Sequence, residues 1–364
     1  MDYARRLSLL LVLLALVPAA AAAPPAGTGT YRLPSGDVLG VFGLGGPHAA
    51  VDFATGEVHG LFASARGYDV GQGILERGTP LGTTALGADP TWLGSPLTRL
   101  PVRYVDVRIG VLSGTLWLPG GGGRHAAVAV VHGSGPATRD YAGALPSFFA
   151  AHGLVVLAFD KRGVGKSGGV YPGERATSRA IDVLARDAAA AARFLSHRPD
   201  VDPRRVGLAG QSQAGWVMAR AAALDPTIRW VIGYSGPSVS VGESDMWGQL
   251  AGQGGPPAEP LAQARRDVLR AGRSGFDPMP SLRKAAIPML FLYGGNDRHV
   301  PTWLCMRRLK PLRRRVEVDW FPRGDHFLID TDHGLTSELQ ASSHYAKGVW
   351  PAIAGWLTRH RLAA

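Results

Sequence analysis

The sequence predicts an α/β protein whose sheet is mainly parallel and covered by helices on both faces. From about residue 101 onward, segments that are apolar throughout recur along the chain, at 125–133, 154–160, 204–210, 228–236 and 287–295. Helical segments at 141–153 and 177–197 stand between several of them. Strands that are apolar on both faces and alternate with helices are typical of a buried parallel sheet with right-handed crossovers.

The first 23 residues have the pattern of a secretory signal peptide. Two arginines precede an apolar run at 7–17, and Pro18 and five alanines follow it. The apolar run is too short to cross a bilayer, and no cysteine that could be lipidated lies nearby. An uncleaved anchor is the alternative. We expect cleavage of residues 1–23 and a periplasmic or secreted protein without a membrane span.

Residues 24–100 predict a small β-rich accessory unit. Gly and Pro interrupt this segment every few residues, and no helical period persists. Such punctuation is typical of short strands joined by turns. The segment contains no catalytic constellation, so we assign residues 101–364 as the main domain.

The main domain opens with a predicted hairpin and contains one predicted insertion. Residues 102–109 and 111–119 read as two alternating strands joined around Gly110. Residues 246–286 interrupt the strand–helix alternation with a Gly- and Pro-rich loop and a short helix. We interpret about 239–286 as a lid, in which Met246 and Trp247 would help to shape an apolar pocket.

Cysteine usage and charge restrict the partners that this chain could have. The single cysteine, Cys305, excludes an internal disulfide and is best read as a buried structural thiol on a helix. The formal net charge is +11, and the densest basic run is residues 307–315. That run has no interleaved aromatic residues and no known nucleic-acid module around it. We expect a solvated basic face and no nucleic-acid partner.

The sharpest local motif is a nucleophile elbow. An apolar strand ends at Gly210, Ser212 follows it, and an Ala-rich helix then begins. A strand that turns at once into a helix holds the serine in strained geometry and presses the residues two before and two after it together. Both must therefore be small, and Gly210 and Ala214 satisfy this requirement although Ala replaces the second glycine. Ser212 is the predicted nucleophile.

A serine nucleophile needs a base and a group that orients the base. Asp297 follows the strand at 287–295, and His326 follows a further strand at 316–322. The order Ser, Asp, His, with each residue after a strand, fits this kind of elbow. His299 lies two residues from Asp297 and is expected to be a local or rim residue. Other polar residues near the end of the chain were judged less suitable as the base or its partner: Asp325, His333 and His344.

Acyl transfer also requires N–H donors for the developing oxyanion. One predicted donor is the backbone amide of Gln213. The second is expected from the loop His132–Gly133–Ser134–Gly135, which follows an apolar strand and whose glycines let the backbone approach a substrate. We favour the Ser134 amide, with Gly133 or Gly135 as alternatives. His132 is expected to support the loop rather than to act as a second base.

The stretch DKRGVGKSGG at 160–169 imitates a phosphate-binding loop. Its end matches Walker A, but Asp160 stands where that motif requires its first glycine. The following glycines and Pro172 also delay the next helix until about Thr177, so no helix N-terminus would meet a phosphate. We read the stretch as a loop beside the active-site mouth, braced by Asp160 and Arg162.

Together these motifs resemble the α/β-hydrolase superfamily, over about residues 102–361. The matching motifs are HGSG, D-x-R-G-x-G-x-S, G-x-S-Q-A-G-W, GGNDRHVP and GDHF. The resemblance is strongest to exported bacterial esterases of the dienelactone-hydrolase and acyl-thioesterase-like kind. It implies hydrolysis of an ester or thioester through an acyl-serine intermediate, without metal or organic cofactor.

Two other functions were weighed against the esterase interpretation. A serine exopeptidase on the same fold would need acidic residues to hold a substrate amine, for which Glu243 and Asp245 are candidates. A non-catalytic binding protein that retains the fold is disfavoured by the complete set of predicted catalytic residues. The sequence leaves open the acyl group, the leaving group and the oligomeric state.

Overall fold

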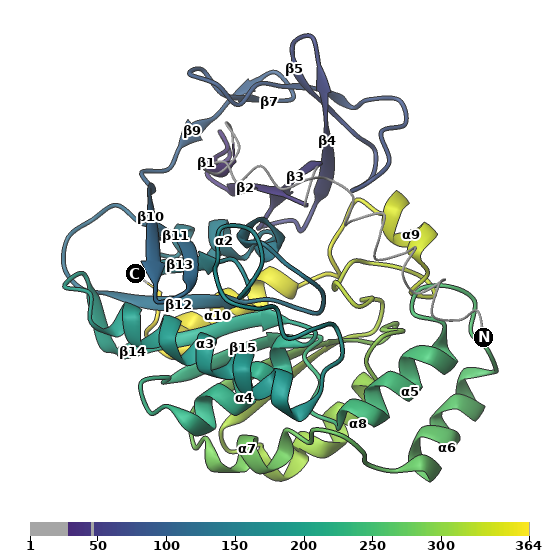
Figure 1. Cartoon of the computed structure of the whole chain (residues 1–364). Coiled ribbons are helices and arrows are strands. Elements are labelled where there is room, and N and C mark those ends of the chain that lie inside the picture. Colours follow the sequence, from purple (N-terminus) through teal and green to yellow (C-terminus); the bar gives the residue numbers. More distant parts are fainter. Residues whose placement is uncertain (1–27, 45–46, 364) are drawn as a thin grey trace.

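The computed structural model describes residues 28–44 and 47–363, and the predicted signal peptide lies outside them. The described chain forms two main sheets, one from its N-terminal quarter and one from the remainder (Figure 1). The predicted α/β fold is confirmed. Within the described residues, no helix has the length and apolar character needed to cross a membrane.

The N-terminal sheet is antiparallel throughout and occupies the segment predicted to be β-rich. Its strand order is β6-β5-β4-β3-β2-β1-β9. The strands are β1 (Gly29–Arg32), β2 (Val38–Gly43), β3 (His48–Asp52), β4 (Val58–Ser64), β5 (Gly67–Val70), β6 (Gly82–Thr84) and β9 (Thr98–Arg99). A separate two-stranded hairpin is formed by β7 (Thr91–Trp92) and β8 (Ser95–Pro96).

The second sheet has eight strands in the order β10-β11-β13-β12-β14-β15-β16-β17. Its strands are β10 (Arg103–Ile109), β11 (Leu112–Leu118), β12 (His125–Val131), β13 (Val155–Phe159), β14 (Val201–Gln211), β15 (Trp230–Tyr234), β16 (Met289–Gly294) and β17 (Val316–Phe321). The predicted hairpin around Gly110 pairs β10 with β11 and joins the sheet antiparallel to β13. All neighbouring pairs from β13 to β17 in this order are parallel.

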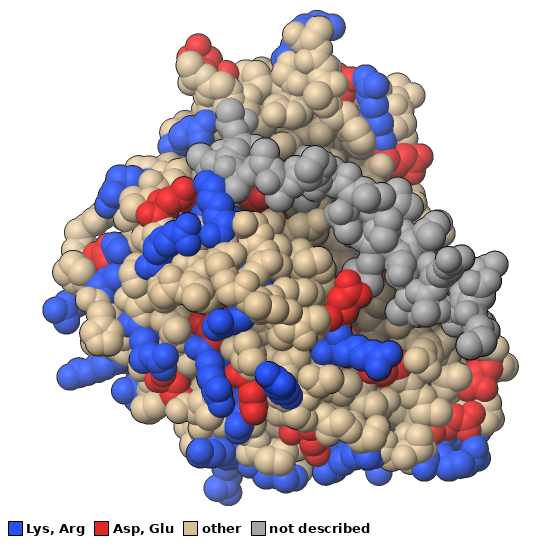
Figure 2. All heavy atoms as spheres, viewed as in Figure 1, with Lys and Arg blue, Asp and Glu red and all other residues tan. Residues whose placement is uncertain are grey.

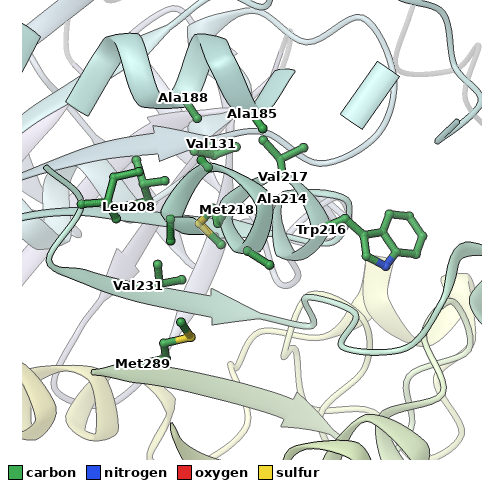
Figure 3. Close-up of a cluster of buried hydrophobic side chains, with 14 of the residues drawn as sticks. Val131, Ala185, Ala188, Leu208, Ala214, Trp216, Val217, Met218, Val231 and Met289 are labelled. Carbon is green, nitrogen blue, oxygen red and sulfur yellow. The ribbon is translucent and has the colours of Figure 1, made fainter. Parts of the chain in front are cut away.

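Helices cover both faces of this sheet because its strands are apolar on both sides. Along β12, Ala127 and Ala129 belong to one buried cluster, whereas Val128 and Val130 belong to another. The first cluster includes α3 (Ser178–Ser196), α4 (Ala214–Leu224), α7 (Met279–Lys284) and α8 (Thr302–Leu309). The second includes α2 (Leu145–Ala151) and α10 (Val349–Arg359). Figure 3 shows side chains of the first cluster: Ala185 and Ala188 of α3, Val217 and Met218 of α4, and Val131, Leu208 and Val231 of the sheet.

The segment between β15 and β16 is more helical than the sequence predicted. In place of one short helix it contains α5 (Val241–Ala251), α6 (Leu261–Ala271) and α7. The start of α5 is set by a capping box in which Ser240 and Glu243 bond each other's backbone amides. The S-x-x-E signature of this box, Ser240 to Glu243, is visible in the sequence.

Short helical segments complete the described chain. Two are 3-10 turns, at Arg139–Ala142 and Lys310–Leu312. The helix α9 (Thr336–Ala341) lies between β17 and α10.

The N-terminal sheet packs against helices α2 and α10 and forms backbone hydrogen bonds with the loop between α9 and α10. Phe53, just after β3, packs edge-on against Phe148 of α2 and Trp350 of α10, with ring centroids 5.1 and 4.8 Å apart. The amides of Val58 and Ile74 donate to the carbonyls of Ser343 and Ser342, at 2.7 and 2.9 Å. The N-terminal unit is therefore packed onto the chain that follows β17.

Charged side chains are dispersed over the surface. Figure 2 shows Lys and Arg scattered among Asp and Glu on one face of the molecule. Part of the basic run at 307–315 has structural partners, since Arg308 pairs with Glu243 and Arg315 donates to the carbonyls of Leu282 and Arg283.

Candidate active site

The predicted site residues lie in loops at one edge of the eight-stranded sheet. Because β12 to β17 are parallel, their carboxyl ends meet at the same edge, where ligands of open α/β sheets bind. Ser212 follows β14, Asp297 follows β16 and His326 follows β17. The 132–135 loop follows β12, and the 160–169 stretch follows β13.

Ser212 occupies the sharp turn between β14 and α4 in a left-handed conformation, with φ of 57°. Such a φ is strained for a residue with a side chain. The turn also requires a glycine at 210, because a Cβ there would lie 2.1 Å from the Val131 carbonyl oxygen and 2.7 Å from the Ala214 Cβ. The alanine at 214 is tolerated because Gly210 leaves room for its methyl group.

Asp297 and His326 form a buried hydrogen-bonded pair. The His326 Nδ1 lies 2.9 Å from Oδ2 and 3.1 Å from Oδ1 of Asp297. The Asp297 Oδ1 also accepts the amides of His299 and Val300, both at 2.8 Å. This arrangement directs Nε2, the other ring nitrogen of His326, away from the carboxylate.

The charges of this pair support each other. Burial alone lowers the pKa of His326, but the attraction and hydrogen bond of Asp297 outweigh it, so the pKa lies above the ordinary value. Burial alone raises the pKa of Asp297, but His326 and the hydrogen bonds hold it below the ordinary value. The carboxylate is therefore ionised at neutral pH and stabilises a protonated imidazole.

The structure brings the loops of Ser212 and His326 together. Gln211, the residue before Ser212, donates from Nε2 to the carbonyl of His326 at 2.8 Å. The 132–135 loop also lies close to Ser212, since a Cβ on Gly133 would lie 3.4 Å from the Ser212 Cβ. The side chain of Gln211 was not among the predicted site residues, because nothing in the sequence shows which loop it faces.

His299 is a local residue of the Asp297 loop, as expected, and it is partly buried. Its ring packs against the ring of His326, with centroids 4.5 Å apart. Burial, and secondarily the charge of His326, lowers the pKa of His299 to about 3, so it is neutral at physiological pH. The Phe327 ring packs edge-on against the same imidazole at 5.5 Å. His326 is thus held between a carboxylate and two rings.

Asp325 folds back onto its own loop, as its position beside His326 predicted. Its Oδ1 accepts the amides of Phe327 and Ile329, at 2.8 and 2.9 Å. Burial raises the pKa of Asp325 to about 7. The two other candidate histidines pair elsewhere, His333 with Glu338 and His344 with Glu57.

Lys161 forms hydrogen bonds to the 132–135 loop, which is predicted to supply the second oxyanion donor. The Nζ of this buried lysine donates to the carbonyls of Gly133 and Gly135, the latter at 2.8 Å. The Gln213 amide, the first predicted donor, stands at the N-terminal end of α4, where the first amides of a helix have no intrahelical acceptor. Lys161 was not singled out in the sequence, although it lies in the DKRGVGKSGG stretch.

His132 supports the loop, in the way its position suggested. It is buried, and its ring packs edge-on against Phe159 with centroids 5.4 Å apart. Burial and the nearby Lys161 ammonium lower the pKa of His132 to about 3. A neutral imidazole packed in this way fills space beneath the 132–135 loop.

The DKRGVGKSGG stretch is braced by two carboxylates. Asp160 accepts the amide and Nε of Arg139, at 2.8 and 3.0 Å, and the amide of Lys166 at 2.9 Å. Arg162 pairs with Asp187 of α3, with Nε to Oδ2 at 3.0 Å. The carboxylate of Asp160 fills the centre of the loop, where a phosphate-binding loop would need empty space.

The predicted lid residues contact the core and the loop of Asp297. Trp247 is buried and donates from its indole to the carbonyl of Asp297 at 3.1 Å. Met246 is partly buried against the core. Glu243, the candidate amine-binding residue of an exopeptidase, caps α5 and pairs with Arg308. The helix α5 therefore supports the loop of Asp297.

Metal-ligating side chains are not gathered at this site. Across residues 28–44 and 47–363, no group of three or more His, Cys, Asp or Glu could hold a metal ion. Cys305 is buried on α8, where burial raises the pKa of its thiol to about 12. It is a structural thiol, as predicted.

Comparisons with known proteins find a family model, sequence relatives and solved structures to which this chain is similar. A model of the family described as "Serine aminopeptidase, S33" matches residues 122–254. An uncharacterized protein of Mycobacterium tuberculosis (strain H37Rv) is 31% identical over 233 residues, which are 62% of this chain and 73% of that protein. The solved structure of DcsB with its substrate analogue has a TM-score of 0.52 at 17% identity and covers 72% of this chain and 100% of that one. A dienelactone hydrolase from Anabaena variabilis has a TM-score of 0.43 at 19% identity, covering 71% and 98%.

Proposed function

The chain belongs to the α/β-hydrolase superfamily and is a hydrolase, and we propose that it cleaves a carboxylic ester or thioester through an acyl-serine intermediate. The observation that carries the proposal is the Asp297–His326 pair, 2.9 Å apart, whose His326 loop is joined by a Gln211 hydrogen bond to the strained turn of Ser212. A serine in a strained turn and an imidazole oriented by a carboxylate are the groups that together activate a hydroxyl for attack on a carbonyl carbon.

The first half of the proposed reaction acylates Ser212. His326 Nε2 takes the hydroxyl proton while Oγ bonds to the carbonyl carbon, and the carbonyl oxygen becomes an oxyanion. The amides of Gln213 and Ser134 hold this oxyanion. Collapse of the tetrahedral intermediate breaks the bond to the leaving group, which takes the proton from His326 and departs as an alcohol or thiol.

The second half releases the acyl group. His326 takes a proton from a water molecule, whose oxygen attacks the acyl carbon through a second oxyanion. The bond to Ser212 Oγ then breaks, Oγ regains the proton from His326, and a carboxylic acid leaves. Asp297 stabilises the imidazolium in both halves. All steps balance with residues of this chain and water.

Amide cleavage is the competing function, since the matching family model is named for an aminopeptidase. The geometry offers it less support, because Glu243 is engaged by Ser240 and Arg308. Asp245 is the remaining acidic candidate, on the exposed side of α5. A substrate ammonium would therefore find no buried unpaired carboxylate at Glu243.

The test is an acyl-chain-length series of p-nitrophenyl esters and matching thioesters, beside aminoacyl amides. We expect ester or thioester turnover by the wild type, loss of at least about 10³-fold in Ser212→Ala, and labelling of Ser212 by a fluorophosphonate. Ser134→Ala is the matched control, because it removes a hydroxyl but keeps the backbone amide. Cleavage of the amides alone, or full activity in Ser212→Ala, would refute the proposal.

We also propose that the protein acts outside the cytoplasm after cleavage of residues 1–23. Support comes from the basic, apolar and small-residue order of that segment. N-terminal sequencing of the protein recovered from the periplasm or the medium tests this, with a start near residue 24 as the expected result.

A further inference from the structure

Lys161 connects the two segments that would hold the oxyanion. Its Nζ donates to the carbonyls of Gly133 and Gly135 and to Oε1 of Gln213, the last two at 2.8 and 3.3 Å. The glycines lie in the loop after β12, and Gln213 directly follows Ser212. We propose that Lys161 is the positioning residue of the oxyanion hole, an inference that rests on the proposed acyl-transfer function.

The geometry of the peptide bond explains how Lys161 would orient a donor. The carbonyl of Gly133 and the amide of Ser134 belong to one peptide unit, and no described peptide bond is cis. In a trans peptide the C=O and N–H point in opposite directions. When Lys161 draws the Gly133 carbonyl toward itself, it turns the Ser134 N–H away from itself. The Gly135 carbonyl only anchors the loop to Lys161. The peptide unit that it belongs to has no N–H to orient, because the next residue is Pro136.

The position of this peptide unit relative to the nucleophile fits the role. Gly133 is in van der Waals range of Ser212, because a Cβ built on it would lie 3.4 Å from the Ser212 Cβ. The Ser134 amide therefore belongs to the residue that directly follows the loop glycine nearest to the nucleophile. Ser134 is exposed, whereas Gly135 is buried, so the loop is open to solvent at the residue that carries the amide and closed at the anchoring glycine.

The charge of Lys161 is costly to bury, which argues against a purely structural role. Lys161 is 3% exposed, and burial lowers its pKa to about 7. Within the part of the chain that the structure describes, the oxygens that its Nζ bonds are two carbonyls and one amide, and none is a carboxylate. The adjacent Asp160 is engaged by Arg139, and Tyr171 offers a ring face 5.9 Å away. A methionine would fill the space of the lysine stem without this desolvation cost.

A buried positive charge stabilises a transition state in which negative charge develops nearby. Both halves of the proposed reaction pass through an oxyanion, which the Lys161 charge and the oriented Ser134 amide would stabilise. The substrate before attack carries no such charge. Loss of Lys161 should therefore slow the chemical steps and leave substrate binding nearly unchanged.

The experiment compares Lys161→Met with Lys166→Met, a matched change at a half-exposed lysine of the same loop. For the best ester of the series, we expect kcat of Lys161→Met to fall about tenfold to a hundredfold with KM within about twofold of wild type. The rate of inactivation by a fluorophosphonate should fall by a similar factor, because attack of Ser212 Oγ on phosphorus, with loss of fluoride, passes through a five-coordinate state in which negative charge develops on the phosphoryl oxygen. Lys166→Met should match the wild type in both measurements.

The outcomes separate this inference from the proposed function. A folded Lys161→Met with wild-type kcat, or with raised KM alone, overturns the positioning role while Ser212→Ala still tests the mechanism. Should the methionine variant not fold, Lys161→Gln carries the same test, because it keeps N–H donors on a neutral and shorter side chain. Wild-type kcat in folded Lys161→Gln would then overturn the role of the charge.

Discussion

At the scale of single residues, the pH dependence of activity depends on the Asp297–His326 pair. The neutral imidazole is the base, so the rate falls as pH drops below the pKa of His326. That pKa is raised above 6.5 by Asp297, so we expect the acid limb of kcat/KM above pH 6.5 in the wild type. In Asp297→Asn, burial still lowers the pKa of His326, but the carboxylate that raised it is gone. The acid limb should therefore move to lower pH, and kcat should fall roughly 10⁴-fold.

The control for this prediction is Asp245→Asn, which removes a carboxylate from the exposed side of α5 and should leave the limb in place. An unmoved acid limb in Asp297→Asn would contradict the assigned pair. Asp297 and His326 could be predicted as the acid and the base from the sequence, because each directly follows a predicted strand. The packing of His299 on His326 could not, since ring contacts between loops leave no trace in local spacing.

At the scale of elements, the β14–α4 turn is set by steric crowding. We expect Gly210→Ala to destabilise the fold by about 1–3 kcal/mol, because its methyl would overlap the Val131 carbonyl at 2.1 Å. Activity should fall as well, since relief of the overlap displaces Ser212. Guanidinium unfolding with a parallel ester assay measures both effects.

The matched control is Gly122→Ala, whose methyl would have no atom within 4 Å and should change stability by less than about 0.5 kcal/mol. Equal stability of the two variants would contradict the crowded turn. Small residues at 210 and 214 were predictable because the turn imposes them locally. The support that α5 gives to the Asp297 loop through Trp247 was not, because it joins residues 50 apart in sequence.

At the scale of the whole molecule, the N-terminal unit and the hydrolase sheet should unfold together. Phe53 packs between Phe148 and Trp350, so Phe53→Ala should lower the free energy of unfolding by about 3–5 kcal/mol. The transition should stay single when followed by circular dichroism and by activity. Leu81→Ala, at a side chain 52% exposed, is the control and should change it little. Two separate transitions, with only the first moved by Phe53→Ala, would contradict shared packing.

The N-terminal unit is also connected to the segment that continues from His326. An isolated antiparallel bridge pairs Glu57 with His344. Beside it, the Tyr345 amide donates to the Gly56 carbonyl at 2.8 Å. The chain from His326 to α10 thus lies against both sheets. The unit that the sequence predicted as an accessory segment therefore contacts the chain that leads from His326 to α10.

The sequence by itself determined the α/β fold, the elbow at Ser212 and the order of Asp297 and His326. Each of these is written in local patterns: apolar strands, small residues around a tight turn, and polar residues directly after strands. Tertiary structure alone decided what Lys161 and Gln211 contact, because their partners lie in loops brought together by the strand order β13-β12-β14 and by the β17 edge. Strand order is a non-local property. The sequence of the DKRGVGKSGG stretch was enough to argue against nucleotide binding. The hydrogen bonds of its Lys161 to the 132–135 loop are visible only in the folded chain.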